Sequence, residues 1–455
     1  MSKLDEAWAP YVPSRELPWN LRRVVHLHRR AGFAATWQEL QRDLADGPGT
    51  SVDRLLKSQA RSNGVPEDFP KIANLLGRSA QDPGRLKAWW IYRMYWGPDP
   101  LGERLTLMWH DHFATSNSKV GDLSAMRRQN EIFRQHARGP FADLLKAVVH
   151  DPALLIWLDA PVNRKGQANE NLGRELMELF TLGVGSYTEK DVKEAARALT
   201  GWTVENGAFR YSVFGHDDGE KTLLSHKGRW HGDDLVRILL EHPATSRRLA
   251  WRICDLFFGE NALPPSSIDA LAAALREHQL EIAWAVETVL RSRTFFADAN
   301  LGERVLGPVE FVVGLPRALE RFETPPSSLL LAEWAARIGQ DLFYPPNVGG
   351  WPSGRGWLGT QAIIGRANFA AALVEGKLTG RPSLLDGIAL AERHQRGKDL
   401  HDLLTFYAEL FTGMAPEPAW RERLTMALGP KAERNPESVA RAIALLMASP
   451  EVQLA

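Results

Sequence analysis

The chain has a single cysteine, Cys254, among 455 residues. One cysteine can form neither an intrachain disulfide nor a zinc site built from several thiolates, so both kinds of support are excluded. Cys254 lies in a strongly apolar run, Leu249 to Phe258, which favours a buried structural thiol over a nucleophile. A chain of this length can bury a large hydrophobic core without such support.

Net charge is also lacking, because 55 basic residues balance 55 acidic ones. Without a surplus of positive charge, the composition gives no sign of nucleic-acid or anionic-membrane binding. No apolar run approaches the ~18 residues that a membrane-spanning helix needs, and the first residues show no secretory leader. We therefore expect a soluble protein with no nucleic-acid partner and no membrane span, cytoplasmic as the sequence is written.

Several catalytic signatures are missing. The sequence has no Gly-x-x-x-x-Gly-Lys-Ser/Thr phosphate loop, no Gly-x-Gly-x-x-Gly dinucleotide motif and no Gly-x-Ser-x-Gly nucleophile elbow. It also lacks the His-Glu-x-x-His pattern that places two zinc ligands on one helix face. These absences argue against the common nucleotide-binding, serine-hydrolase and zinc-protease classes.

The hydrophobic spacing predicts a mainly α fold, a large multi-helical domain with a small β-hairpin insert. Thr36 and Glu39 form a capping-box pattern at the start of one predicted helix. The insert is expected at about 203–232, where Asn206-Gly207 gives the turn of a short hairpin, followed by a polar loop. We expect an irregular segment at 1–20, a main helical domain at 21–375, and a C-terminal helical segment at 383–455 packing on it.

The stretch from Asn169 to Gly183 predicts one helix of about three turns. Its apolar side chains share a stripe at Leu172, Leu176, Leu179 and Phe180. A polar stripe lies about 100° round the helix, at Asn171, Glu175 and Glu178. The two glutamates are either ordinary surface residues or the wall of a polar pocket at the edge of the core.

A second polar sequence ends the predicted helix Leu101 to Phe113. His110 and His112 project nearly opposite each other on an ideal helix, because residues two apart differ by about 200°. They can converge on one site only if the helix ends or tightens here. The alternative for His112 is a core-facing imidazole with a satisfied hydrogen bond.

Several motifs occur together along the chain: His26 to Phe33, Trp109 to Thr115, Asn169 to Gly183, Ala195 to Trp202, His216 to Thr222, Pro345 to Pro352 and Ala448 to Glu451. In this combination and order the sequence resembles a bacterial family catalogued as domain of unknown function 1800. The resemblance implies no chemistry. It implies that relatives are often exported and often encoded beside a second uncharacterised family, domain of unknown function 1501, related to alkaline phosphatases and sulfatases, which would supply a partner.

The first functional hypothesis is a hydrolase that uses a His/Glu/Asp pocket, with or without a divalent metal. The candidate catalytic residues are Glu175, Glu178, His112, His216, Asp217 and Lys221. The candidate substrate-binding residues are Asn171, Arg174, Trp202, Asn347, Trp351 and Arg355. If Zn²⁺ or Mn²⁺ is bound, its candidate ligands are His110, His112, Glu175 and His216, and the metal would activate a water molecule.

Two alternatives remain open. Glu175 and Glu178 lie ~5–6 Å apart at Cβ on one helix, so they could serve as the acid and base of a metal-free glycoside-processing enzyme. Tryptophans such as Trp202 and Trp351 would then stack on sugar rings. In the other alternative the protein is a non-catalytic helical binding or assembly protein that acts with a neighbouring partner, and the polar motifs are buried structural networks.

Overall fold

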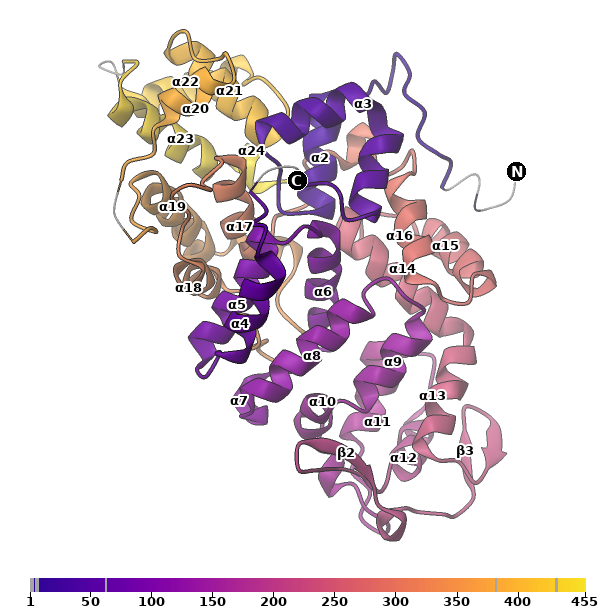
Figure 1. Cartoon of the computed structure of the whole chain (residues 1–455). Coiled ribbons are helices and arrows are strands. Elements are labelled where there is room, and N and C mark those ends of the chain that lie inside the picture. Colours follow the sequence, from indigo (N-terminus) through magenta and orange to yellow (C-terminus); the bar gives the residue numbers. More distant parts are fainter. Residues whose placement is uncertain (1–3, 5–7, 62–63, 381–382, 430–432) are drawn as a thin grey trace.

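The structure is a computed structural model that describes all residues except 1–3, 5–7, 62–63, 381–382 and 430–432. It confirms a mainly α fold with a small β insert (Figure 1). The helices of the first half are α2 (Leu21–Ala31), α3 (Trp37–Leu56), α4 (Phe69–Arg78), α5 (Pro83–Trp96), α6 (Pro100–His112), α7 (Asn117–Val120), α8 (Leu123–Gln135), α9 (Phe141–Val149), α10 (Pro152–Trp157), η1 (Ala160–Val162), α11 (Asn171–Glu175), η2 (Leu176–Thr181) and α12 (Glu189–Ala198).

The second half has one short helix, η3 (Val213–Gly215), inside the β insert and then continues as helices after it. They are α13 (Gly232–Glu241), α14 (Pro243–Phe258), α15 (Pro265–Glu277), α16 (Ile282–Leu290), η4 (Asp298–Asn300), α17 (Pro308–Ala318), α18 (Ser328–Ile338), η5 (Gly354–Leu358), α19 (Thr360–Val374), α20 (Gly387–Arg393), α21 (Leu400–Thr412), α22 (Pro418–Leu428), α23 (Pro436–Ala448) and α24 (Pro450–Gln453). Among the described helices, none combines the length and apolarity needed to cross a bilayer.

The predicted hairpin is confirmed. Strands β1 (Trp202–Glu205) and β2 (Ala208–Tyr211) pair antiparallel. Asn206 and Gly207 between them both have positive φ, as a tight two-residue hairpin turn requires. The polar loop expected after it is partly wrong, because β3 (Lys221–Leu223) and β4 (His226–Gly228) form a second antiparallel pair.

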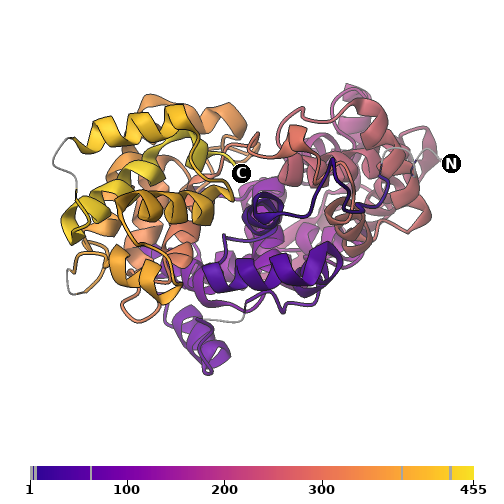
Figure 2. The same ribbon diagram turned by 90° about the horizontal axis from the view of Figure 1, so that it is seen from above.

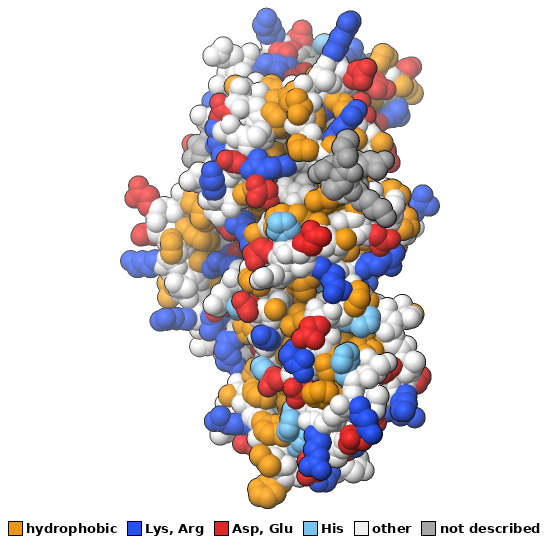
Figure 3. All heavy atoms as spheres, turned by 90° about the vertical axis from the view of Figure 1, so that its right-hand side faces the viewer, with side chains coloured by type: hydrophobic (Ala, Val, Ile, Leu, Met, Phe, Trp, Pro, Cys, Tyr) orange, Lys and Arg blue, Asp and Glu red, His pale blue; other side chains and the backbone are white. Residues whose placement is uncertain are grey.

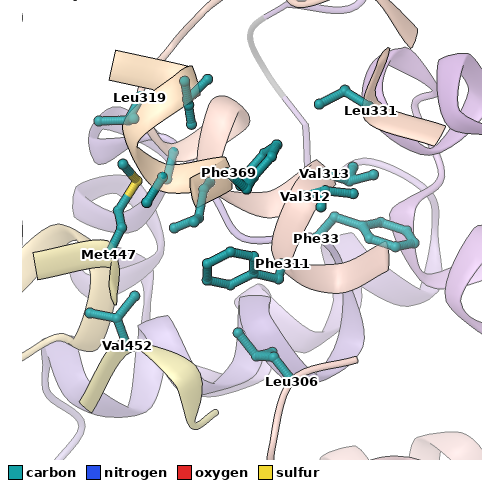
Figure 4. Close-up of a cluster of buried hydrophobic side chains, with 14 of the residues drawn as sticks. Phe33, Leu306, Phe311, Val312, Val313, Leu319, Leu331, Phe369, Met447 and Val452 are labelled. Atoms are coloured by element: carbon teal, nitrogen blue, oxygen red, sulfur yellow. The ribbon is translucent and has the colours of Figure 1, made fainter. Parts of the chain in front are cut away.

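Two hydrophobic cores organise the helices. The first core joins N-terminal residues to the C-terminal third, and Figure 4 shows Phe33, Phe311, Phe369 and Met447 meeting in it. The second core is built mainly from residues between 101 and 296. Seen from above, the C-terminal helices α20 to α23 and the helices α14 to α16 lie on opposite sides of the molecule (Figure 2). Charged side chains of both signs are interspersed over the face in Figure 3.

Helix α6 lies where the two cores meet. Leu107 belongs to the first core, whereas Met108 and Trp109 belong to the second. Every α6 residue except Asp111 is buried, so its polar side chains must find partners inside the protein. Glu103 accepts hydrogen bonds from the Trp90 indole (3.0 Å) and from two arginines, which supplies such partners.

The stretch predicted as one regular α-helix is irregular. After the short helix α11, residues Leu176 to Thr181 form a π-helix, η2. The Leu182 amide reaches back to the Met177 carbonyl, five residues earlier, and one extra residue per turn shifts the following side chains round the axis. Leu179, predicted for the buried stripe, is therefore only partly buried, while Met177 is fully buried.

Candidate functional site

The end of α6 connects three parts of the fold through three consecutive residues. His110 is completely buried and stacks on Trp351 (5.4 Å between ring centroids, 20° between planes). The rings of Trp90, Phe343 and Phe133 make edge-on contacts with it, with ring centroids 5.2–5.7 Å apart. Neither of its ring nitrogens has a hydrogen-bond partner among the described residues. Burial lowers the pKa of His110 to about 3, so the ring is neutral.

His112 points the other way, into the second core. Its Nε2–H donates to the Phe180 carbonyl at 3.1 Å, near the end of η2. The last carbonyls of a helix lack partners within the helix, so His112 satisfies one of them. Burial, and then the positive charges of Arg248 and Arg252, lower the pKa of His112 well below its usual value. The geometry is that of a core-facing imidazole with a satisfied hydrogen bond.

Phenylalanine at each histidine should separate the two environments. His112→Phe leaves the buried Phe180 carbonyl without a donor, so we expect a loss of about 1–3 kcal/mol in the free energy of unfolding. His110→Phe puts an apolar ring into an apolar cage and removes two unpaired nitrogens, so we expect a change within about 1 kcal/mol. Urea denaturation of both variants measures the difference, and a larger loss for His110→Phe would contradict these environments.

Asp111, between the histidines, ties α6 to two distant segments. Its Oδ1 accepts the Trp351 amide at 2.8 Å, and its Oδ2 accepts the Arg252 guanidinium of α14 at 2.5 Å. Gly350 lies against this carboxylate with φ of 92°, and a Cβ there would collide with Asp111. Asp111 and the Gly350-Trp351 loop, which belong to two motifs far apart in sequence, therefore form one joint.

A polar cavity of about 100 Å³ opens at this joint. We call it the junction cavity. Its walls come from α6, from α14 and the two residues after it, from the segment 304–310, from Gln340 and from the loop before α19. Trp351 and Trp357 form an aromatic wall, and both are nearly fully buried. The cavity thus lies between the two cores, a common position for ligand sites because such junctions leave concave spaces.

The charged groups of the junction cavity are arranged around Glu310. This buried carboxylate receives both Nη atoms of Arg304 at 2.7–3.0 Å, the Arg104 guanidinium at 2.9 Å and the Gly307 amide at 2.7 Å. The positive charges of Arg104 and Arg304 outweigh burial and hold the pKa of Glu310 below its usual value. Arg104 approaches Glu310 as an ion pair, and among the described residues neither its Nε nor its Nη2 makes a hydrogen bond, so the network retains donor capacity beside the cavity.

Glu175 and Glu178, predicted as catalytic, lie at the edge of the second core and are half-buried. Glu178 accepts a hydrogen bond from the Tyr187 hydroxyl. Glu175 makes no hydrogen bond or ion pair in the described part of the chain. Burial, and then the neighbouring charge of Glu178, raise the pKa of Glu175. The pair therefore holds one carboxyl with a raised pKa beside one that is hydrogen-bonded.

The predicted residues of the β insert form a separate network. The His216 Nδ1–H donates to the Thr200 carbonyl at 2.9 Å, and its ring stacks on His231. Asp217 binds Arg197, which with an amide from Gly219 lowers its pKa to about 2. The buried Lys221 ammonium donates to the carbonyls of Asp217 and Gly219. These contacts lie within the insert and the end of α12, and they stabilise the loop itself.

The predicted substrate-binding residues are divided among several places. Asn171 donates to Asp159 and Arg174 pairs with Glu170 and Glu189 on the surface. Trp202 is buried and packs on His150 and Phe209. Asn347 accepts the Gly349 amide within its own turn. Trp351 lines the junction cavity, whereas Arg355 is exposed.

The four predicted metal ligands are not gathered into one group. Within the described ranges, no three His, Cys, Asp or Glu side chains lie close enough to hold a metal ion. His110 faces the first core, His112 donates to Phe180, and His216 donates to Thr200. The prediction that His110, His112, Glu175 and His216 share a metal is therefore not supported by the geometry, because two nearly opposite α6 faces separate the first two.

The cavity residues that the sequence did not single out are mostly arginines and their partners. Arg104, Arg252 and Arg304 lie in ordinary helical or loop sequence, and Glu310 stands in an apolar run. The only sequence feature that could have identified these residues is a charged side chain at a position where the apolar pattern predicts burial. Asp111 lay inside the Trp109–Thr115 motif, but its role depends on Arg252 and Trp351, which no spacing rule connects to it.

Comparison with known proteins gives a family and no activity. The family model described as protein of unknown function (DUF1800) matches residues 26–454, nearly the whole chain. No curated protein and no solved structure matches it. The matched region includes α6, the stretch from Asn169 to Gly183 and the loop that carries Trp351. The chain therefore belongs to the DUF1800 family.

Proposed function

We propose that the protein is a non-catalytic binding protein that holds a small hydroxyl-rich ligand, such as a sugar or polyol, in the junction cavity. The observation that carries this proposal is the position of a polar, tryptophan-walled cavity between two hydrophobic cores. Ligand sites occur preferentially at such junctions.

The lining chemistry supports a ligand with hydroxyl groups. A hydroxyl both donates and accepts hydrogen bonds, so it can donate to the carboxylates of Asp255 and Glu260 and accept from the guanidinium of Arg104. Trp351 and Trp357 give the cavity an aromatic wall, which suits the apolar side of a sugar ring. The paired charges nearly cancel, which favours a neutral ligand over a strongly charged one.

The side chains also support binding over catalysis at this site. Asp111 is the acidic residue of the α6 motif, but both its oxygens accept hydrogen bonds, from Trp351 and Arg252. Glu310 is held by two arginines and an amide. A general base needs a free lone pair within reach of the proton that it removes, and the donors that surround both oxygens of Glu310 leave that carboxylate none.

Calorimetric titration with glucose, N-acetylglucosamine, glucuronate and glycerol tests the proposal. We expect saturable binding of at least one neutral member. Trp357→Leu, which removes one cavity wall, should weaken that binding at least about tenfold, since base or ring stacking on an aromatic contributes about 1–3 kcal/mol. Trp334→Leu is the matched control, because Trp334 packs on Phe369 outside the cavity. No saturable heat with any member would refute the proposal.

A hydrolase that uses Glu175 and Glu178 is a second candidate. Its support is the raised pKa of Glu175, the property expected of a general acid, beside a second carboxylate. If it is correct, Glu175→Gln should abolish turnover of the substrate, with a loss of about 10²–10⁴-fold. A screen of nitrophenyl glycosides and esters supplies the assay, with Glu189→Gln as an exposed control on the same surface. Full activity of Glu175→Gln would exclude this role.

A neighbouring protein of the family of unknown function 1501 is our proposed partner. It is supported by exposed apolar side chains near the start of α19, where Ile363 and Ile364 are 53% and 55% exposed. Exposed apolar clusters often mark protein interfaces. Co-purification with such a protein should be lost when both isoleucines are replaced by serine, and unchanged co-purification would contradict this surface.

A further inference from the structure

A second concave site lies at the amino-terminal half of α14, away from the junction cavity. It has a volume of about 250 Å³. One wall is α14, with Arg247, Arg248 and Trp251, and the opposite wall is the loop after η2, with Gly183 and Ser186. The junction cavity uses later α14 residues, Arg252 and Asp255, so the two sites share the helix but not their lining. We call this second site the α14 pocket.

Arg248 is held rigidly in the α14 pocket. Its Nε donates to the Leu179 carbonyl at 3.0 Å, and its guanidinium lies 4.4 Å from the centre of the Trp251 ring. Leu179 belongs to η2, whose terminal carbonyls lack partners within the helix. The π-helix therefore supplies the acceptor that fixes one edge of the guanidinium, and the indole fixes its plane.

The remaining edge of Arg248 is uncommitted. In the described part of the chain no carboxylate lies within 4.0 Å of this guanidinium, and its Nη atoms are not among the buried atoms that lack partners. The Nη atoms are therefore open to solvent, on a residue that lines the pocket. Burial and the positive charge of Arg252 lower the pKa of Arg248 to about 10, which leaves it positively charged at neutral pH.

The other groups around the pocket leave one net positive charge. Arg247 pairs with Asp269 at 2.6 Å. Asp255, the nearest carboxylate along α14, pairs with Arg252 at 3.1 Å. The hydroxyl of Ser186 makes no hydrogen bond that the structure shows in its described residues. Leu182 and Ile268 complete an apolar wall beside Trp251.

We propose that the α14 pocket binds a small organic monocarboxylate, with its carboxylate on the free edge of Arg248 and its apolar part against Trp251 and Ile268. A guanidinium edge offers two parallel N–H donors that match a carboxylate. The single net positive charge of the pocket balances the single negative charge of a carboxylate, whereas one of the two negative charges of a phosphate dianion would have no positive partner. The apolar wall requires an organic group behind the anion.

Titration of the full-length protein with benzoate at low salt tests this site. We expect saturable binding of benzoate, and much weaker binding of benzamide, which has the same shape without the charge. Inorganic phosphate should compete poorly. Arg248→Gln should weaken benzoate binding at least about tenfold, because hydrogen bonds to charged groups are the stronger class.

Two further variants keep the test decisive. Arg337→Gln is the matched control, because Arg337 also stacks on a tryptophan, Trp334 at 5.2 Å, but lies on α18 outside the pocket. Its benzoate binding should be unchanged. If Arg248→Gln does not fold, Ser186→Asp places a competing carboxylate in the pocket from an outer loop, and it should also abolish binding.

The possible outcomes separate this site from the junction cavity. Benzoate binding that is retained in both Arg248→Gln and Ser186→Asp would overturn the proposal, as would equal affinity for benzamide. Phosphate binding as strong as benzoate binding would overturn the assignment to carboxylates. Trp357→Leu, which alters only the junction cavity, should leave benzoate binding intact, so the two sites can fail independently.

Discussion

Glu310→Gln is expected to lower the free energy of unfolding by about 3–5 kcal/mol, the cost of breaking a buried ion pair. Glutamine has nearly the same shape, so the change removes charge and little volume. The side chain of Arg104 is 2% exposed and that of Arg304 is 10% exposed. Neither can turn to water when its carboxylate is lost, and two buried positive charges would remain close together.

Chemical denaturation followed by circular dichroism measures this loss. Glu333→Gln is the matched control, because Glu333 pairs with Arg337 on the surface of α18 and is 44% exposed. Exposed pairs of this kind contribute less than about 1 kcal/mol. Equal effects of the two substitutions would mean that the Glu310 network is open to solvent, and the junction cavity would then lack the buried wall described above.

The second large effect concerns Asp151, whose burial raises its pKa to about 7 from a usual value of 3.8. The folded protein therefore binds this proton more tightly than the unfolded chain does. The resulting stabilisation is complete below about pH 4 and is lost as the pH rises through 7. Three pKa units correspond to a change on the order of 4 kcal/mol.

Asp151→Asn should remove most of this pH dependence and stabilise the protein at neutral pH. Asparagine can still accept the Leu154 amide at the start of α10, and its own amide can donate to Gln129, whose Oε1 lacks a partner among the described residues. His110 and His112 have lowered pKa values and act in the opposite direction. The difference between wild type and variant at each pH is therefore the quantity to measure.

Denaturation at pH 4, 5.5 and 7 gives that difference. Asp191→Asn is a control for the direction of the pH dependence, because hydrogen bonds from Thr188 and Leu224 outweigh burial and lower the pKa of Asp191. That variant should lose stability at neutral pH and little at low pH. A wild-type advantage over Asp151→Asn that grows as the pH rises to 7 would contradict the raised pKa of Asp151.

Local features of the fold were predictable because their causes are local. The capping box at Thr36 and Glu39 forms as expected, since it needs only four consecutive residues. The turn at Asn206 and Gly207 forms because these residue types tolerate positive φ. The π-helix η2 was not predictable in this way, because its extra residue is supported by Arg248 and His112, which come from other helices.

The candidate site was likewise only partly predictable, because its contacts come from distant parts of the chain. The sequence marked the histidines around Asp111 as polar and left their direction open. In the structure His110 packs in the first core and His112 donates a hydrogen bond to η2. Asp111 accepts hydrogen bonds from Arg252 and Trp351, which lie 141 and 240 positions away in the sequence. Spacing along α6 cannot choose among these partners, because all sides of a helix at the centre of a protein are buried and each side meets a different neighbour.

By itself the sequence determined the helical class, the capped helix starts, the hairpin turn and the family, because periodicity, caps and motif order act over short stretches or are compared directly. The tertiary structure alone decided which polar residues are internal ties and which remain free for a ligand. The physical reason is that a buried charge is tolerated only beside a partner. Folding surrounds the buried Glu310 carboxylate with arginines, whereas it leaves the half-buried Arg248 guanidinium with one backbone acceptor and no carboxylate among the described residues.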